Sequence, residues 1–264
     1  MLLEAMIYAV TPCTDIARRM GFLRESISII SRHRRCKRQW SNHLFESRQI
    51  IKTAIKKTSG DRRAIILGAG LGHDLPLADL ITHFQEVILV DLVHSWPIRL
   101  LAWKNPKIKL ITHDVTESLH NLARGDLNIQ SPNRFLDDIH VNLVVSLNIL
   151  SQLPTLPAAY LEDHFRMGEE ITRVVSTKII QYHIDYLKKF SGTVCLITDI
   201  EREIRDADGT RVEKFSALQG LVFPWRCKNW VWEIAPLGEE SLDYSVRHHV
   251  AGISNLSEAI IKEK

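Results

Sequence analysis

The sequence predicts an α/β fold: a doubly wound, mostly parallel seven-stranded sheet with a C-terminal antiparallel hairpin and an N-terminal helical extension. Three observations lead to this prediction. From Arg63 onward, short β-branched apolar runs alternate with helical stretches, as in parallel sheets with crossover helices. Before that, Asp15–Lys57 has a helical pattern and no proline. Near the C-terminus, two strand-like runs lie too close together for a crossover helix.

The five parallel strands are predicted from compact apolar runs, which are typical of strands covered on both faces. Helices are expected between them. One covers His73–His83, with Asp74 as its cap and Pro76 in its first turn. Another covers about Glu162–Phe190 and ends at Ser191-Gly192. The strand runs are RAIIL (Arg63–Leu67), EVILVD (Glu86–Asp91), KIKLITHD (Lys107–Asp114), VNLVVSL (Val141–Leu147) and TVCLITD (Thr193–Asp199).

The predicted hairpin comprises NWVWEIAP (Asn229–Pro236) and DYSVRHHVAGI (Asp243–Ile253), joined by LGEES. Trp230 and Trp232 alternate on one strand face, which predicts that both belong to the core. The turn that joins the strands, with Glu239 in it, is expected to open toward the ligand edge of the sheet.

Composition limits the class of protein. The 264 residues are 45% hydrophobic and 25% charged, as in a globular chain, and a net charge of +3 argues against an extended nucleic-acid footprint. The apolar N-terminus is short and carries Glu4, and no apolar run approaches the ~20 residues of a membrane span. We therefore expect a cytoplasmic protein with no membrane partner. The four cysteines are widely separated, so no metal site is predicted, and nothing indicates the oligomeric state.

The strongest local motif is ILGAGLGHDLP, in which Gly68, Gly70 and Gly72 turn the chain from a strand toward a helix. Glycines let a ligand approach the backbone, and a helix start supplies free N–H groups. A dinucleotide fingerprint needs its third glycine where this chain has His73. The GxGxG spacing favours S-adenosylmethionine over NAD, with a nicotinamide-dependent dehydrogenase as the last alternative.

Acidic residues end the next two predicted strands. Asp91 ends the second strand, about 20 residues beyond the glycines, where a carboxylate can accept hydrogen bonds from ribose hydroxyls. The alternative is that Asp91 caps a helix formed by VHSWPIRLLAWK. Asp114 ends the third strand in LITHDVTE. Carboxyl ends of parallel strands meet at one edge, where ligands bind in open α/β sheets.

From about Arg63 to Ile253 the chain resembles class I S-adenosylmethionine-dependent methyltransferases. GAGLGHD resembles their glycine loop, EVILVD their acidic second strand, KIKLITHDVTE the segment whose aspartate reads the adenine amino group, and VNLVVSLNILSQLP the fourth-strand motif beside the methyl group. The terminal hairpin is similar to their sixth and seventh strands. The resemblance implies a Rossmann-like methyltransferase domain over 61–264, with 1–60 as a helical extension packed on it. It also implies these cofactor-binding residues: Gly68, Gly70, Gly72, Asp74, Asp91, Leu92, Asp114, Val115 and Asn148.

The chain departs from the family pattern at two positions. Ile66 stands where the family often has an acid that holds the methionine amino group, and Asp74 is the expected substitute. Asn142 stands where an aspartate usually opens the fourth strand. These differences keep open a non-catalytic binding protein with a methyltransferase fold.

The candidate catalytic residues are Ser151, Asp199 and His183. Ser151, with Gln152, follows the fourth strand and should face the methyl donor, or else close its own loop. Asp199 ends the fifth strand and could face the acceptor or cap the next segment. His183 could serve as a base or could be packed, and the pair His248-His249 offers the same chemistry.

One N-terminal helix has three interpretations. Trp40, Leu44, Ser47, Ile51 and Ala54 recur at helical spacing, which favours packing over the sheet. Alternatively, Trp40 and His43 cover the active site. A third interpretation uses the basic cluster to bind RNA phosphates or an acidic substrate; its members are Arg32, Arg34, Arg35, Lys37 and Arg38. The leading hypothesis is therefore a methyltransferase that modifies a small-molecule acceptor by in-line transfer, ahead of an RNA methyltransferase.

Overall fold

The computed structural model describes residues 2–259 and is built on one eight-stranded sheet. Its strand order is β3-β2-β1-β4-β5-β8-β7, and β6 pairs with β5. Strands β1 to β5 are parallel, whereas β8 runs antiparallel to both β5 and β7. The predicted α/β class and the C-terminal hairpin are confirmed. The strands are β1 (Arg63–Leu67), β2 (Glu86–Asp91), β3 (Ile108–Thr112), β4 (Val141–Leu147), β5 (Thr193–Asp206), β6 (Arg211–Ser216), β7 (Lys228–Ala235) and β8 (Tyr244–Ile253).

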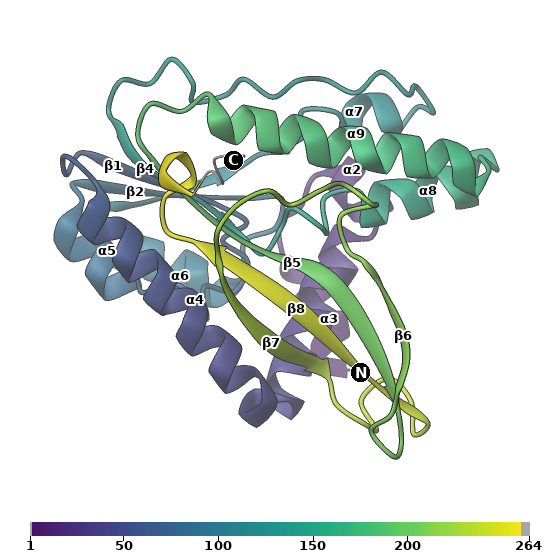
Figure 1. Ribbon diagram of the computed structural model, residues 1–264. Helices are drawn as coiled ribbons and strands as arrows, with labels where there is room; N and C mark the ends of the chain where they lie inside the picture. Colours follow the sequence, from purple (N-terminus) through teal and green to yellow (C-terminus); the bar gives the residue numbers. More distant parts are fainter. Residues whose placement is uncertain (1, 260–264) are drawn as a thin grey trace, which may run out of the picture.

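Helices cover both faces of the sheet (Figure 1). Side chains alternate along β1, so that Ile66 packs in the core beneath α4, α5 and α6, whereas Ile65 and Leu67 pack in the core beneath α9. No helix within residues 2–259 is long and apolar enough to cross a membrane. The helices are α1 (Leu2–Val10), α2 (Asp15–Arg19), α3 (Phe22–Arg35), α4 (Lys37–Lys57), α5 (Leu77–His83), α6 (Trp96–Lys104), α7 (Leu119–Leu122), α8 (Thr155–Phe165) and α9 (Glu169–Lys188), followed by the 3₁₀ turn Leu256–Glu258.

The helices before β1 cover both a face and an edge of the sheet. The apolar stripe of α4 is buried in the core, which confirms the packing interpretation of this helix. Leu23 and Ile27 of α3 pack instead against Val93, just beyond the carboxyl end of β2. The N-terminal segment therefore helps to enclose the edge at which the five parallel strands end.

The sheet has one more strand than predicted, and β5 is longer. All six residues of β6 are exposed, so its sequence lacks the apolar run that identifies a buried strand. Its partner is the outer part of β5, which continues beyond Asp199 as far as Asp206. In Figure 1, β5, β6 and β8 project together beyond the rest of the sheet.

Two predicted helices have different boundaries. The helix expected over His73–His83 begins only at Leu77, after a glycine-rich turn, so Asp74 does not cap it and Pro76 precedes it. The helix expected over Glu162–Phe190 is two helices, α8 and α9. Arg166 adopts a left-handed conformation with φ of 56° and ends α8, and α9 begins after Gly168.

Gly192 is required by close packing rather than by a helix end, since α9 already ends at Lys188. A Cβ at residue 192 would lie 2.7 Å from the carbonyl oxygen of Asn142 and 2.8 Å from that of Val141. We expect Gly192→Ala to lower the free energy of unfolding by about 1–3 kcal/mol, because backbone atoms must shift. Denaturant titration measures this. Gly168→Ala, whose Cβ would meet nothing within 4 Å, is the control, and equal losses in the two variants would contradict the account.

Candidate cofactor-binding site

The glycine loop after β1 is shaped by its neighbours. Gly68, Gly70 and Gly72 have φ of 83°, 48° and 69°, the region that favours glycine. A Cβ on Gly68 would lie 2.1 Å from Ile149 Cγ2, and one on Gly72 would lie 2.6 Å from Ile98 Cδ1. At Gly70 the nearest such atom is 3.9 Å away. Gly68 is therefore required by packing, because its Cβ would also lie 2.9 Å from the Leu147 carbonyl oxygen. In contrast, the Ile98 side chain can move away from Gly72, and Gly70 leaves room beside the loop.

Asp91 joins the glycine loop to the end of β2. Its Oδ2 accepts a hydrogen bond from the Gly70 N–H at 2.7 Å, and its Oδ1 accepts from Leu92 at 2.7 Å and Val93 at 3.3 Å. Burial raises the pKa of this carboxyl, although these three bonds oppose the shift. The alternative role as a helix cap is wrong, because Ser95 is the N-cap of α6. A carboxylate has about four acceptor positions, so one remains for a ligand hydroxyl.

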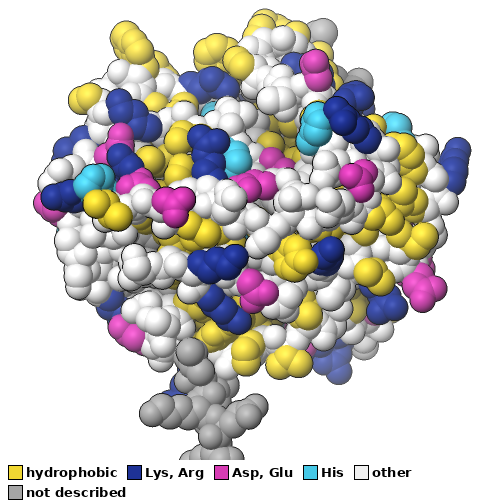
Figure 2. Space-filling view, turned by 90° about the horizontal axis from the view of Figure 1, so that it is seen from above, with side chains coloured by type: hydrophobic (Ala, Val, Ile, Leu, Met, Phe, Trp, Pro, Cys, Tyr) yellow, Lys and Arg dark blue, Asp and Glu magenta, His cyan; other side chains and the backbone are white. Residues whose placement is uncertain are grey.

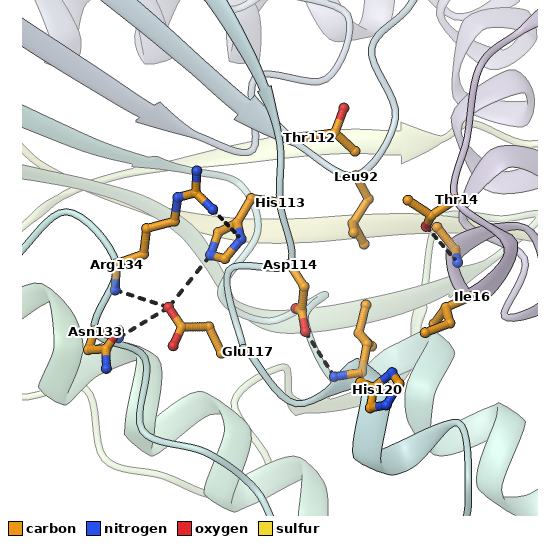
Figure 3. Close-up of a pocket in the computed structure, with 12 residues that line it drawn as sticks. Thr14, Ile16, Leu92, Thr112, His113, Asp114, Glu117, His120, Asn133 and Arg134 are labelled. Atoms are coloured by element: carbon orange, nitrogen blue, oxygen red, sulfur yellow. Dashed lines mark hydrogen bonds and ion pairs between the residues drawn. The ribbon is translucent and has the colours of Figure 1, made fainter.

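A pocket of about 640 Å³ lies between α2 and the residues that follow β2 and β3, and its lining includes Leu92, the residue after Asp91. Leu92, which was predicted to contact the cofactor, lines it together with Ile16 of α2 (Figure 3). His113, Glu117 and Arg134 stand together on the opposite side (Figure 3). The volume is in the range of ligand-binding pockets.

Asp114 lines this pocket, but its carboxylate is bonded within its own loop. Its Oδ1 accepts hydrogen bonds from the backbone N–H of Thr116 at 2.9 Å and from its hydroxyl at 2.7 Å. Its Oδ2 accepts from the N–H groups of Ser118 at 2.9 Å and Leu119 at 2.8 Å. All four acceptor positions are used within its own loop, so this carboxylate has none for an adenine amino group. Val115, partly buried, packs against the core beneath α9.

Asp74 and Asn148, predicted from separate motifs, meet at the end of β4. Asn148 has φ of 55°, and its side-chain Nδ2 lies 2.9 Å from Asp74 Oδ2. Its Oδ1 is buried and has no hydrogen-bond partner within the described part of the chain. Burial raises the pKa of Asp74 to about 6, against the opposing effects of its hydrogen bonds and of Arg48. An unpartnered buried oxygen beside a carboxylate is suited to binding an ammonium group.

His43 of α4 contacts this pair, so the helix reaches the site as well as packing on the sheet. Its Nε2 lies 3.3 Å from Asn148 Nδ2, and its Nδ1 accepts a hydrogen bond from Trp230 Nε1 at 3.1 Å. Trp232 stacks on the imidazole at 3.9 Å. The prediction that both tryptophans belong to the core is confirmed by exposures of 8% and 7%. The contact between His43 and Trp230 joins residues far apart in sequence, and no motif indicates it.

Ser151 and Asp199 also come together, and His248 joins them. The Ser151 hydroxyl donates a hydrogen bond to Asp199 Oδ1 at 2.8 Å, and His248 Nδ1 lies 3.2 Å from Oδ2. Burial acts to raise the pKa of Asp199, but His248 and Ser151 outweigh it and the pKa is lowered. The group brings an imidazole beside a carboxylate, and an imidazole has the chemistry of a general base. Sequence reasoning named His248 but did not pair it with Asp199.

His183 lies in the core and cannot meet a substrate there. Only 1% of it is exposed, and its Nε2 is 3.0 Å from the Ser146 hydroxyl. Burial lowers the pKa of this imidazole to about 3, so it stays neutral. We therefore withdraw it as a candidate base. Asn142 has a structural role, because its Oδ1 accepts a hydrogen bond from the Arg62 N–H at 2.8 Å.

Glutamates of the β7–β8 turn neutralise part of the basic cluster. The Arg35 guanidinium donates two hydrogen bonds to Glu239, at 2.8 and 2.5 Å, and Arg32 lies 3.0 Å from Glu240. The hydrogen bonds of Arg35 lower the pKa of Glu239. On the face shown in Figure 2, basic side chains alternate with acidic ones and form no continuous stripe. The ion pairs of Arg32 and Arg35 with the two glutamates do not favour binding of a nucleic-acid backbone by this cluster.

The strand order and the antiparallel β8 between β5 and β7 define the fold of class I S-adenosylmethionine-dependent methyltransferases. The glycine loop, Asp91 and the Asp74–Asn148 pair lie at the edge where such a sheet binds ligands. Residues 2–259 contain no group of three or more His, Cys, Asp or Glu side chains placed to hold a metal ion.

Comparisons with solved structures find similarities to methyltransferases. The 1,6-didemethyltoxoflavin-N1-methyltransferase of Burkholderia thailandensis, bound to 1,6-didemethyltoxoflavin and S-adenosylhomocysteine, is 12% identical, with a TM-score of 0.41 over 92% of both chains. NodS, an N-methyltransferase of Bradyrhizobium japonicum WM9, is 12% identical, with a TM-score of 0.33 over 79% of this chain and 94% of that one. The 23S rRNA methyltransferase ErmE is 12% identical, with a TM-score of 0.33 over 82% and 71%. No protein-family model matches the sequence, and no curated protein does.

Proposed function

We propose that this protein is an S-adenosylmethionine-dependent methyltransferase that acts on a small-molecule acceptor. The observation that carries the proposal is the pairing of Asp74 with Asn148, whose buried oxygen has no protein partner in residues 2–259, at the same sheet edge as Asp91. These groups fit the two ends of the cofactor. Asp74 and Asn148 would hold the methionine ammonium group, and Asp91 would accept a ribose hydroxyl.

The cofactor supplies an activated methyl group, so the protein chiefly has to align the acceptor and exclude water. Helices α2 to α4 enclose the site edge, which supports exclusion of water. Where the acceptor must lose a proton, Asp199 with Ser151 and His248 is the candidate group. Asp199 lies within β5, two residues beyond Ile197, whose carbonyl oxygen accepts a hydrogen bond from the Asn148 N–H at 2.8 Å.

A small acceptor is favoured over RNA by the ion pairs of the basic cluster. Two cations of the basic cluster, Arg32 and Arg35, are engaged by glutamates. An RNA-binding enzyme would lose affinity steeply as salt rises, because phosphate contacts release counterions. RNA binding in the micromolar range that weakens in this way between about 50 and 200 mM salt would favour the RNA alternative.

Calorimetric titration of the purified protein with S-adenosylmethionine and, separately, NAD tests the cofactor. We expect binding of S-adenosylmethionine with a Kd in the micromolar range, about −8 kcal/mol, and no binding of NAD. Binding of NAD alone would contradict the proposal. Methyl transfer from labelled cofactor to any member of a small-molecule panel would exclude the non-catalytic alternative.

A further inference from the structure

The His43 imidazole faces two hydrogen-bond donors. Trp230 Nε1, which can only donate, lies 3.1 Å from Nδ1, and the amide nitrogen of Asn148 lies 3.3 Å from Nε2. Burial lowers the pKa of His43 to about 3, so the ring is neutral and has one N–H and one bare nitrogen. It cannot accept from both donors. The indole N–H of Trp230 can only donate, and His43 Nδ1 is the acceptor it meets within residues 2–259. Nδ1 is therefore the bare nitrogen of the imidazole, and Nε2 carries the hydrogen.

This tautomer determines how the Asn148 amide can be oriented. The oxygen and nitrogen of an amide exchange places by a 180° rotation, and hydrogen bonding decides between the two orientations. An Nε2–H donor on His43 requires the Asn148 oxygen to face it. After the rotation, the Asn148 oxygen also lies 2.9 Å from Asp74 Oδ2, at the position that Nδ2 occupied. Two oxygens at this distance need a hydrogen between them, so Asp74 must then be protonated. The chain of hydrogen bonds from Trp230 to Asp74 is complete only in this state.

Ionised Asp74 requires the other orientation. The Asn148 nitrogen then donates to the carboxylate and turns its second hydrogen toward the N–H of His43. Two donors face each other, and one hydrogen bond of the chain is lost. In this orientation the Asn148 oxygen lies at the buried position that has no partner within residues 2–259, where an ammonium group could donate to it.

We propose that His43 is a positioning residue which, held in one tautomer by Trp230, couples the protonation of Asp74 to the orientation of the Asn148 amide and so sets the pH range of cofactor binding. The inference rests on the proposed function, since the ligand is the ammonium group of S-adenosylmethionine or its product. Protonated Asp74 and the rotated amide present a donor where the ammonium group needs acceptors.

The direction of the pH effect follows from the groups around Asp74. Its pKa of about 6 means that it is ionised above that pH, so the affinity for the ammonium group is full there and falls as the pH drops through this value. Arg48 of α4 favours the ionised form by its charge. Asp199 and His248 act on His43 in opposite directions. Two further ionisable groups are His73 in the same loop and His33 of α3, stacked on it at 4.0 Å, and burial lowers the pKa of both.

The test is calorimetry with S-adenosylhomocysteine from pH 5 to pH 8, applied to the wild type, Trp230→Phe and Trp225→Phe. Phenylalanine lacks the indole N–H, so His43 can adopt the tautomer that accepts from Asn148. We expect Trp230→Phe to bind about threefold to tenfold more tightly than the wild type below pH 6, the value of one hydrogen bond. Its midpoint shifts to lower pH by about 0.5–1 unit, and its affinity at pH 8 is unchanged.

Trp225→Phe is the matched control, because Trp225 is also buried but packs beneath α9. It should leave the pH midpoint unchanged. If the wild type binds S-adenosylhomocysteine and Trp230→Phe has the same pH midpoint of affinity, this inference is overturned and the proposed function stands. Absence of binding by the wild type at every pH would overturn both.

The tautomer can be observed without any substitution. Nitrogen-15 NMR of the wild-type imidazoles should show His43 with a bare Nδ1 and a protonated Nε2 at pH 7. The opposite tautomer would overturn the inference even if Trp230→Phe does not fold. A mere packing role for Trp230 would lower the affinity equally at all pH values, which separates that explanation from the present one.

Discussion

Gly68→Ala is expected to destabilise the protein by about 2–5 kcal/mol. Two costs add: a positive φ strains any residue with a Cβ by about 1–2 kcal/mol, and overpacking adds about 1–3 kcal/mol. The strain follows from the φ of Gly68, which is 83°. The overpacking follows from the new Cβ, which would lie 2.1 Å from Ile149 Cγ2 and 2.9 Å from the Leu147 carbonyl oxygen. The last contact is with backbone and cannot be relieved by a rotamer change.

Gly70→Ala is the matched comparison, because Gly70 also has positive φ but no atom closer than 3.9 Å. Its expected cost is only the conformational strain, about 1–2 kcal/mol. Denaturant midpoints of the two variants and the wild type measure the difference. If Gly68→Ala were no less stable than Gly70→Ala, the close approach of the loop to Ile149 would be contradicted.

Asp91→Ala should weaken the binding of S-adenosylhomocysteine about ten- to a hundredfold or slightly more, equivalent to about 1.5–3 kcal/mol. The substitution removes the acceptor of the ligand hydroxyl. It also leaves the N–H groups of Gly70, Leu92 and Val93, which shape the loop, without their acceptor. Both losses act on the same site, so affinity falls more than overall stability does.

Calorimetry of Asp91→Ala, together with its thermal midpoint, separates affinity from unfolding. Asp79→Ala is the control, because Asp79 lies on α5 and pairs with Lys52 at 3.2 Å. It should bind like the wild type. An Asp91→Ala protein that is folded and binds with unchanged affinity would contradict the placement of the ribose.

The fold was predictable because the apolar runs that form β1, β2 and β4 are buried on both faces, so their pattern is unambiguous. Strand β6 could not be predicted from the sequence, because all six of its residues are exposed and it pairs with the outer half of β5. The break between α8 and α9 depends on Arg166 in a left-handed conformation, which its side chain does not favour.

The site was predictable only in part. Motif order brought Asp74, Asp91 and Asn148 to one edge, because parallel strands end together. It could not show that Asp114 uses all its acceptor positions in its own loop, since that depends on how residues 116–119 turn. One alternative for the N-terminal helix did place His43 over the active site, but its contact with Asn148 could not be predicted, because packing between α4 and the sheet decides that contact.

The most direct test of the central claim is a crystal structure of the protein with S-adenosylhomocysteine. The account predicts the ribose within hydrogen-bond distance of Asp91 and the ammonium group between Asp74 Oδ2 and Asn148 Oδ1. The adenine should lie in the pocket beside Leu92, with Asp114 still bonded to its own loop. Ligand bound elsewhere, or an ammonium group far from Asp74, would contradict it.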